Sequence, residues 1–190
     1  NLQPLTREDL THFVGPPLSV SFPIVFAPRG VPADEMHLFI AEYRENYSAT
    51  HLPHTPLNPG MGEALVELKK EWRLAIVTSK PEPQALIAIQ ATGVRHYFDI
   101  VVGPHDDSEI PKAQLLQRAL REMNELHGEL PPLTSCWMIG DRHHDIDAGV
   151  EVGTRTVGVL WGFGSREELS SAGATAIVET PQDLVAVLNN

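Results

Sequence analysis

From residue 60 onward, short apolar runs alternate with segments of helical periodicity, and this alternation restricts the possible folds more than any other feature. Strands separated by helices of about 10–15 residues argue for a parallel sheet with helices on both faces. The sequence therefore predicts an α/β fold with a doubly wound parallel sheet. The expected strands are 73–77, 98–103, 136–139, 154–160 and 174–178.

Residues 1–58 follow a different pattern, one of helices and proline-rich turns. Their periodicity and turn residues predict helical elements and no strand-and-helix alternation. The expected elements are a capping box at Thr6 and Asp9, a helix stop at Gly15-Pro16-Pro17, a helix over 36–47 and a linker over 51–60. We therefore expect two domains, 1–58 and 59–190.

The composition argues against several classes of partner and site. Asp and Glu outnumber Lys and Arg by 25 to 14, for a formal net charge of −11, and no basic block occurs. We therefore expect neither nucleic acid nor a membrane as a partner. No apolar run reaches the roughly 18 residues of a membrane span, and no Cys/His spacing of the zinc type occurs. The single cysteine, Cys136, excludes an internal disulfide and fits a reducing cytoplasm.

An apolar run over 136–139 ends in Gly140 and is followed by Asp141 and Asp145. If the run is a buried strand, Asp141 lies at its carboxyl end, where open parallel sheets bind ligands. Asp145 then falls in the first turn of the next helix. Two hard oxygen ligands in one small volume suit Mg²⁺, which binds one or two carboxylates with water and substrate phosphate. An N-cap carboxylate beside a surface Asp would give the same spacing.

Polar groups follow two other elements. Thr78 and Ser79 come after the strand expected over 73–77, where a hydroxyl and free backbone N–H groups can hold a phosphate oxygen. An ordinary capped turn has the same composition. Lys112 begins a helix, where its charge opposes the helix dipole at a cost of roughly a few tenths of a kcal/mol. Lys112 could neutralise phosphate charge and orient a carboxylate, or it could be a solvated surface lysine.

Taken in order, these features resemble motifs two, three and four of the haloacid dehalogenase (HAD) superfamily. The order is a strand followed by Thr78, a lysine at a helix start, and a strand followed by Gly-Asp-x-x-x-Asp. The resemblance covers nearly the whole chain and is closest to the phosphoglycolate-phosphatase-like branch. The matching stretches are 13–18, 43–47, 76–81, 97–99, 140–145 and 158–165.

The resemblance implies a HAD-like Rossmannoid core and a small helical cap, formed by residues 1–58, that closes over the site and selects the substrate. Thr78 would hydrogen-bond the transferring phosphoryl group, with help from the backbone N–H of Ser79. Lys112 would bridge the phosphate and a nucleophilic carboxylate. Asp141 would ligate Mg²⁺, and Asp145 would ligate it directly or through water.

The family's first motif, a strand that ends in Asp-x-Asp-Gly-Thr, does not occur in these 190 residues. Its first Asp attacks phosphorus to form an aspartyl-phosphate, and its second is the general acid and base. In related folds this strand lies between the strands of motifs two and four. We therefore expect either an N-terminal segment beyond these residues or another strand in that gap, and we expect the 190 residues alone to be inactive.

The leading functional prediction is a Mg²⁺-dependent phosphomonoester hydrolase of a small phosphorylated metabolite, acting through an aspartyl-phosphate. A phosphomutase or a dehalogenase is an alternative within the family. The alternative from another class is a catalytically inactive HAD-fold protein that binds or regulates. Both a monomer and a homodimer fit the sequence, which does not identify the phosphorylated substrate.

Overall fold

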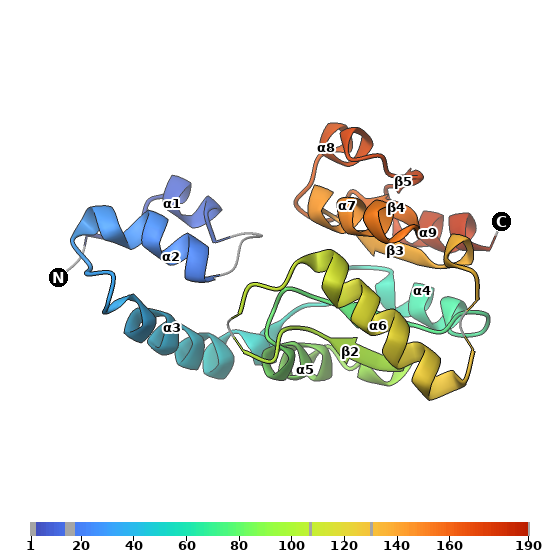
Figure 1. The fold of residues 1–190 in the computed structure, drawn as a ribbon, viewed down its shortest axis with the longest axis horizontal. Coiled ribbons are helices and arrows are strands. Elements are labelled where there is room, and N and C mark those ends of the chain that lie inside the picture. The colour runs from blue at the N-terminus through green and yellow to red at the C-terminus, as the bar shows by residue number, and fades with distance from the viewer. Residues whose placement is uncertain (1–2, 14–17, 107, 130, 190) are drawn as a thin grey trace.

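The computed structural model describes residues 3–13, 18–106, 108–129 and 131–189, so the helix stop expected at 15–17 lies outside the described residues. Its described strands are parallel and form two hydrogen-bonded sheets (Figure 1): β1 pairs with β2, and β4 lies between β3 and β5. The strands are β1 (Ala75–Val77), β2 (Ile100–Val102), β3 (Trp137–Gly140), β4 (Arg155–Val159) and β5 (Ala176–Val178). All five predicted strands are present, and four of them are shorter than predicted.

Helices account for most of the remaining described chain, and none of them is long and apolar enough to cross a bilayer. The helices are α1 (Arg7–Thr11), α2 (Leu18–Phe26), α3 (Met36–Thr50), α4 (Met61–Leu68), α5 (Glu82–Ala91), α6 (Lys112–His127), α7 (His143–Val152), α8 (Arg166–Ser171) and α9 (Pro181–Leu188). Short 3₁₀ turns are η1 (Ala27–Arg29), η2 (Leu52–His54), η3 (Arg95–Tyr97) and η4 (Leu133–Ser135). The sequence pattern predicts neither α2 nor α8.

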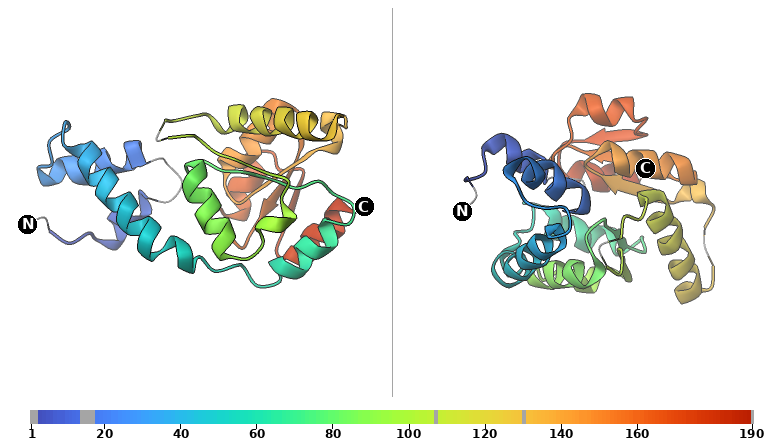
Figure 2. Two further views of the ribbon diagram at one scale, coloured as in Figure 1. Left: turned by 90° about the horizontal axis from the view of Figure 1, so that it is seen from below. Right: turned by 60° about the vertical axis from the view of Figure 1, so that its left-hand side comes forward.

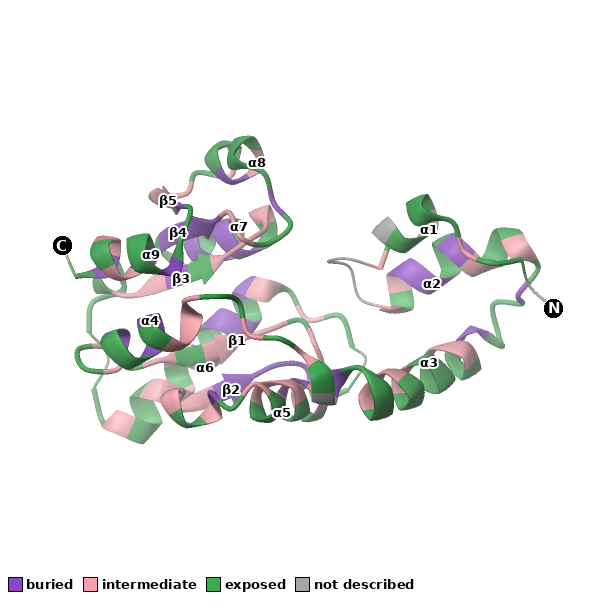
Figure 3. Cartoon of the chain, turned by 180° about the vertical axis from the view of Figure 1, so that it is seen from behind, coloured by how far each residue is buried: buried purple, intermediate pink, exposed green. Residues whose placement is uncertain are grey.

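The first three helices form a separate helical part to one side of the strands (Figures 1 and 2). The predicted capping box begins α1: Asp9 N–H donates to Thr6 Oγ1 at 3.2 Å, and Thr6 N–H donates to Asp9 Oδ2 at 2.7 Å. A small core of Phe22, Val31 and Met36 holds the helices together. Most of α3 is exposed (Figure 3), and it leads through η2 toward the strands.

The segment expected as a linker, 51–60, is partly anchored. Its 3₁₀ turn η2 contacts α5, and the side chain of Leu52 in that turn is fully buried. Burying a leucine side chain contributes roughly 1.5–3 kcal/mol. The helical part is therefore joined to the strand-containing part through a packed turn.

Helices cover both faces of the strands, as the doubly wound prediction requires. On one face α6 packs against β1, β2 and α7, and α7 packs against β3 and β4. On the other face of the larger sheet, α4 and α9 bury apolar residues against β4 and β5. The residues in this second layer are Leu68, Val157, Val159, Val178, Leu184 and Leu188. The α/β fold predicted from the sequence is confirmed.

The single sheet expected from the sequence is instead divided between β1 and β3. A cavity of about 660 Å³ lies there, lined by Ala75 and Val77 of β1, by Met138 and Ile139 of β3, and by part of α6. Because β1 and β3 each pair on one side only among the described strands, each presents an open backbone edge at this cavity. The division occurs at the position where the HAD resemblance places a further strand.

Asp99 ties the start of β1 to β2. Its carboxylate accepts hydrogen bonds from Lys69 Nζ at 2.8 and 2.9 Å and from Leu74 N–H at 2.9 Å, while Asp99 N–H donates to Leu74 O at 2.8 Å. Burial by itself raises the pKa of Asp99, but the bonds from Lys69 and Leu74 outweigh it and hold the pKa below its ordinary value. This carboxylate therefore stabilises the fold in its ionised form.

Replacing Asp99 with Asn should lower the free energy of unfolding at neutral pH by about 1–2 kcal/mol, because the charge-assisted bonds with Lys69 are lost. The folded-state pKa lies below that of the unfolded chain, so this stabilisation is complete above the unfolded pKa and disappears as the pH falls through the folded value. Urea unfolding of both proteins at several pH values measures the difference. A difference that does not shrink in acid would contradict this account, and Asp34→Asn, at an exposed turn position, is the control.

Candidate active site

A pocket of about 490 Å³ lies where β1 and β3 end, and the helical part forms one of its sides. Its lining includes Thr78, Ser79, Lys112, Asp141 and Asp145. The structure thus brings every predicted site residue to one pocket, although these residues come from the ends of two strands and the starts of two helices. Parallel strands deliver their carboxyl ends to the same edge, which explains the convergence.

Lys112 is the first residue of α6 and reaches back toward the strand ends. Its Nζ lies 3.1 Å from Asp145 Oδ1 and donates to Val77 O at 3.4 Å. Only 16% of the Lys112 side chain and 12% of the Asp145 side chain are exposed. The alternative of a solvated surface lysine is therefore wrong, and the carboxylate that Lys112 contacts in this chain is Asp145.

The loop that carries Asp141 is held by the glycine-containing segment 162–164, which follows β4. Asp141 Oδ2 accepts a hydrogen bond from Phe163 N–H at 2.8 Å, and Gly164 N–H donates to Asp141 O at 2.9 Å. A Cβ atom added to Gly162 or Gly164 would overlap atoms of Asp141. Close backbone approach, which glycine alone allows, therefore fixes the position of this carboxylate.

Gly140 has the same function for Asp145. A Cβ atom on Gly140 would overlap the side chain of Asp145, so that side chain can lie over the end of β3 only because position 140 is glycine. Asp145 is the third residue of α7, and its Oδ2 accepts a hydrogen bond from Arg142 N–H at 3.3 Å. One oxygen thus caps the helix while the other faces Lys112.

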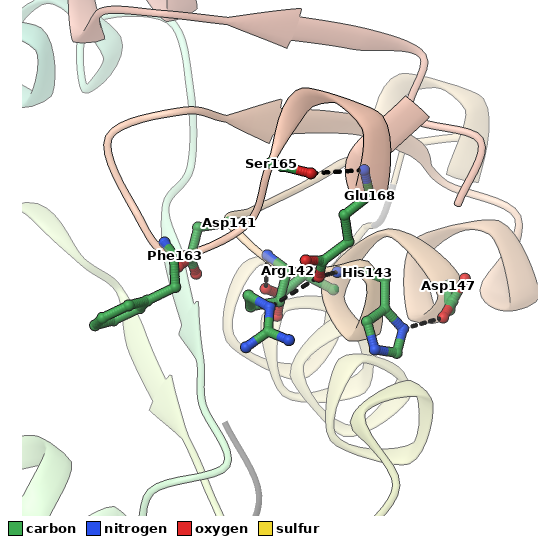
Figure 4. A network of polar contacts seen from close by, with 8 residues as sticks. Asp141, Arg142, His143, Asp147, Phe163, Ser165 and Glu168 are labelled. Atoms are coloured by element: carbon green, nitrogen blue, oxygen red, sulfur yellow. Dashed lines mark hydrogen bonds and ion pairs between the residues drawn. The ribbon is translucent and has the colours of Figure 1, made fainter. Parts of the chain in front are cut away.

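Glu168 of α8 supports the loop from outside the pocket (Figure 4). Its Oε1 accepts hydrogen bonds from Arg142 Nε at 2.8 Å and from His143 N–H at 2.9 Å. The bond from the His143 backbone and then the one from Arg142 lower the pKa of Glu168. The sequence pattern assigns Glu168 no role in the site, but Ser165 three residues earlier gives the Ser-x-x-Glu pattern of a helix start, and Ser165 Oγ accepts a hydrogen bond from Glu168 N–H at 3.1 Å.

The two adjacent histidines, His143 and His144, begin α7. His143 Nδ1 is 2.9 Å from Asp147 Oδ2 on the exposed side of α7. His144 lines the pocket, and burial, followed by the charges of His143 and Arg142, lowers its pKa. His144 is therefore predominantly neutral at neutral pH.

Thr78 is part of a turn as well as of the pocket. Its N–H donates to Val102 O at 2.9 Å, and its Oγ1 accepts from Lys80 N–H at 3.1 Å. The capped turn considered as an alternative is thus present. It is compatible with phosphate binding, because the Thr78 hydroxyl hydrogen is still a donor.

The helical part adds residues to the pocket to which the sequence pattern assigns no role. Tyr43, Arg44 and Tyr47 of α3 line it together with Lys80 from the turn after β1. The stretches 43–47 and 76–81 match the HAD pattern, but a helix and a turn far apart in sequence give no sign that they meet. Their proximity depends on the path of α3 and is visible only in three dimensions.

The donor set fits Mg²⁺. Asp141, in the turn after β3, and Asp145, in the first turn of α7, supply two hard carboxylates, and Mg²⁺ needs only one or two when water and phosphate complete its shell. Within the described ranges, no three His, Cys, Asp or Glu residues lie close enough together to hold a metal by themselves. A cation here would therefore depend on ligands from water and substrate.

Comparison with known proteins identifies the relatives of this chain. A family model described as haloacid dehalogenase-like hydrolase matches residues 1–159. The tyrosine-protein kinase PtkA of Mycobacterium tuberculosis is 33% identical over 92% of this chain, which spans only 57% of the length of PtkA. The pyrophosphatase PpaX of Listeria monocytogenes is 32% identical, with 97% of this chain and 81% of PpaX covered.

Solved structures agree with this grouping. A predicted phosphatase from Clostridium acetobutylicum has a TM-score of 0.82 at 28% identity, with 98% of this chain and 83% of that chain covered. The structure of PtkA has a TM-score of 0.76 at 30% identity, with 98% and 84% covered. Sequence and fold thus point to the same group of proteins.

Gly140→Ala should displace Asp145 and break its contact with Lys112, with a loss of about 1–3 kcal/mol in the free energy of unfolding from overpacking. Chemical denaturation measures this loss. Gly62→Ala is the matched control, because a Cβ there meets only Leu57 Cδ2 at an ordinary 3.8 Å. Equal stability of the two variants would show that the packing at Gly140 is not tight.

Glu168→Ala should speed amide hydrogen exchange at His143, because the acceptor of that N–H is removed. Nuclear magnetic resonance or mass spectrometry can follow the exchange. Glu167→Ala removes the neighbouring exposed carboxylate and should leave exchange at His143 unchanged. Unchanged protection in Glu168→Ala would mean that Glu168 does not hold the loop.

Proposed function

Because the chain belongs to the haloacid dehalogenase-like hydrolase family, we propose that its pocket hydrolyses a phosphomonoester of a small phosphorylated metabolite with the help of Mg²⁺. The observation that carries this proposal is the meeting of the Thr78 hydroxyl, the Lys112 ammonium and the carboxylates of Asp141 and Asp145 in one pocket. Catalysis of phosphoryl transfer depends mainly on positioning the reacting groups and on stabilising the charge of the transferred phosphoryl group. A donor, a cation and a pair of carboxylates supply both.

Each residue has a part in this scheme. The Thr78 hydroxyl donates to a phosphoryl oxygen, with the backbone N–H of Ser79 beside it. Lys112 lies 3.1 Å from Asp145 and offsets negative charge on the phosphoryl group. Asp141 and Asp145 hold Mg²⁺, which when bound supplies further stabilisation of that charge.

The nucleophile in this proposal comes on a further strand. The cavity of about 660 Å³ between β1 and β3 has an open strand edge on each side, and a parallel strand there would end beside Thr78 and Asp141. A carboxylate at its end attacks phosphorus as the bond to the ester oxygen breaks, and a second acid protonates that oxygen. Water then hydrolyses the aspartyl-phosphate to release phosphate and restore the carboxylate.

The proposed function also includes a compartment, a class of partner and an oligomeric state. The protein acts in the cytoplasm on a small phosphorylated metabolite, with neither nucleic acid nor a membrane as partner, and as a monomer or a homodimer. The net charge of −11 and the single cysteine support these points. A pyrophosphatase and a tyrosine kinase are both among its relatives, so the choice of substrate depends on the pocket itself.

The alternative is a catalytically inactive protein that uses the same pocket to bind phosphorylated ligands. It is favoured by one observation, that none of the described strands ends in Asp-x-Asp. Catalysis is favoured over binding alone by the presence of all four predicted site residues, Thr78, Lys112, Asp141 and Asp145. A phosphatase turns over a phosphomonoester and an inactive binding protein does not, so an activity assay distinguishes the two functions.

The protein expressed from its complete reading frame should hydrolyse p-nitrophenyl phosphate in the presence of Mg²⁺ and lose activity with a chelator. Asp141→Asn or Asp145→Asn should lower kcat/KM by about 100-fold or more, because the charge stabilisation is lost. The exposed control Asp34→Asn should leave it unchanged. Turnover that is independent of metal would refute the proposal, and Mg²⁺-dependent phosphate binding without turnover would favour the alternative.

The 190 residues expressed alone should show no turnover, because the nucleophile is absent from them. They should still unfold cooperatively, since each part has its own buried core. Activity of the 190 residues at the level of a protein that includes the proposed further strand would refute the strand proposal. Circular dichroism provides the control that both proteins are folded.

A further inference from the structure

Aromatic rings line the pocket from both parts of the chain, and the proposed phosphoryl chemistry uses none of them. Phe13 lies just after α1, Tyr43 and Tyr47 lie on α3, and Phe163 lies in the loop after β4. The whole chain has three Trp, three Tyr and six Phe residues, and four of these line this one pocket. The rings are therefore concentrated at the pocket and are not a general feature of the surface.

Phe163 presents its ring to solvent although its backbone is fixed. It is 74% exposed, more than any other large hydrophobic residue in the described part of the chain. Its N–H donates to Asp141 Oδ2 at 2.8 Å, and Figure 4 shows the ring pointing away from Asp141. Within the described residues, Phe163 belongs to none of the hydrophobic core clusters. A single exposed ring is common on protein surfaces, so its meaning depends on what lies near it.

Tyr43 is the second exposed ring of the pocket, and it comes from the helical part. It is 40% exposed, packs edge-on against Phe22 with 5.4 Å between ring centres, and stacks on Tyr47 with 5.6 Å. These neighbours fix the plane of the ring and leave part of it open. Burial, followed by the neighbouring Tyr47, raises the pKa of Tyr43, so the side chain is a neutral phenol. Two exposed and uncharged rings on different elements therefore line the pocket.

The position of the two rings associates them with the part of the substrate beyond the phosphoryl group. In the proposed reaction the strand-end residues bind the phosphoryl group, so the rest of the substrate is what remains to contact the helical part. Tyr43 lies on the helical part, and Phe163 adjoins the phosphoryl end through its bond to Asp141. A planar ring gains from such rings both by burying apolar area and by edge and offset stacking, which a saturated group cannot make.

We propose that Phe163 and Tyr43 form an aromatic subsite, which binds a planar ring in the leaving group of the substrate. The substrate class is then phosphomonoesters of small alcohols or phenols that carry an aromatic or heteroaromatic ring. This inference rests on the proposed phosphatase function and specifies its substrate. A pocket of about 490 Å³ has room for a phosphoryl group and such a ring.

Three unreactive phosphonates of equal charge test the subsite. Benzylphosphonate carries an aromatic ring, cyclohexylmethylphosphonate carries a saturated ring with the same number of carbons, and ethylphosphonate carries no ring. Their affinities for the protein from its complete reading frame are measured by calorimetry with Mg²⁺ present. Benzylphosphonate should bind about tenfold or more tightly than ethylphosphonate and about threefold or more tightly than cyclohexylmethylphosphonate. A pocket that is merely apolar would bind the saturated ring at least as well, because that ring is the more hydrophobic of the two.

Variants then assign the preference for the aromatic over the saturated ring. Phe163→Leu and Tyr43→Leu keep an apolar side chain but remove the ring, so each should about halve the preference, and the double variant should abolish it. Tyr43→Phe retains the ring and should retain the preference. Tyr97→Leu makes the same change at a ring outside this pocket and should behave as the wild type. The preference is a ratio of two affinities, so any change in phosphonate binding itself cancels.

Each outcome has a defined meaning. If cyclohexylmethylphosphonate binds as tightly as benzylphosphonate, the aromatic subsite is overturned while the phosphatase proposal stands. A preference that survives in the double variant overturns the subsite as well, because other groups then bind the ring. If none of the three phosphonates binds with Mg²⁺ present, the phosphatase proposal fails together with the subsite. Unchanged circular dichroism and Tm show that the variants are folded.

Discussion

The contact between Lys112 and Asp145 joins the two halves of the α/β structure at the end where the strands finish. Lys112 begins α6, which packs on β1 and β2, and Asp145 lies in the first turn of α7, which packs on β3 and β4. Between these halves the backbone ladder is interrupted at the cavity beside β1 and β3. The ion pair and the packing of α6 on α7 therefore set the spacing of the two strand ends, on which the separation of the strand-end residues depends.

The Lys112–Asp145 ion pair is largely buried, so setting the spacing in this way has a large desolvation free energy. Taking both charges out of water offsets much of their attraction, and a hydrophobic pair would be at least as stabilising. The same charges are useful if a phosphoryl group and a cation are to lie beside them, because the lysine and the carboxylate are then already oriented. The surrounding structure, including the glycine contacts and Glu168, maintains this orientation from the backbone side.

The sequence predicts the α/β part well because the hydrophobic pattern and the helix signals agree there. The segment 112–127 is an example, because its apolar face predicts the helix that is observed as α6, which ends at Gly128 in the left-handed conformation. Prediction is weaker for α2, which is apolar on all sides and contains Pro23, so that its periodicity is lost. Thr78, Lys112, Asp141 and Asp145 could be identified because each follows a strand or begins a helix. Arg44, Lys80 and Glu168 could not, because their positions depend on how separate elements pack.

The difference between these two sets of residues follows from the fold. Residues at strand ends are aligned by the sheet, so any chain with this topology brings them together. Residues on α3 reach the pocket only through the orientation of the helical part, which η2 fixes by burying Leu52 against the structure around α5. Substitutions on α3 can therefore alter the lining of the pocket without disturbing the strand-end residues. The strand-end residues and the α3 residues of the pocket thus lie on separate structural elements, which are joined by one packed turn.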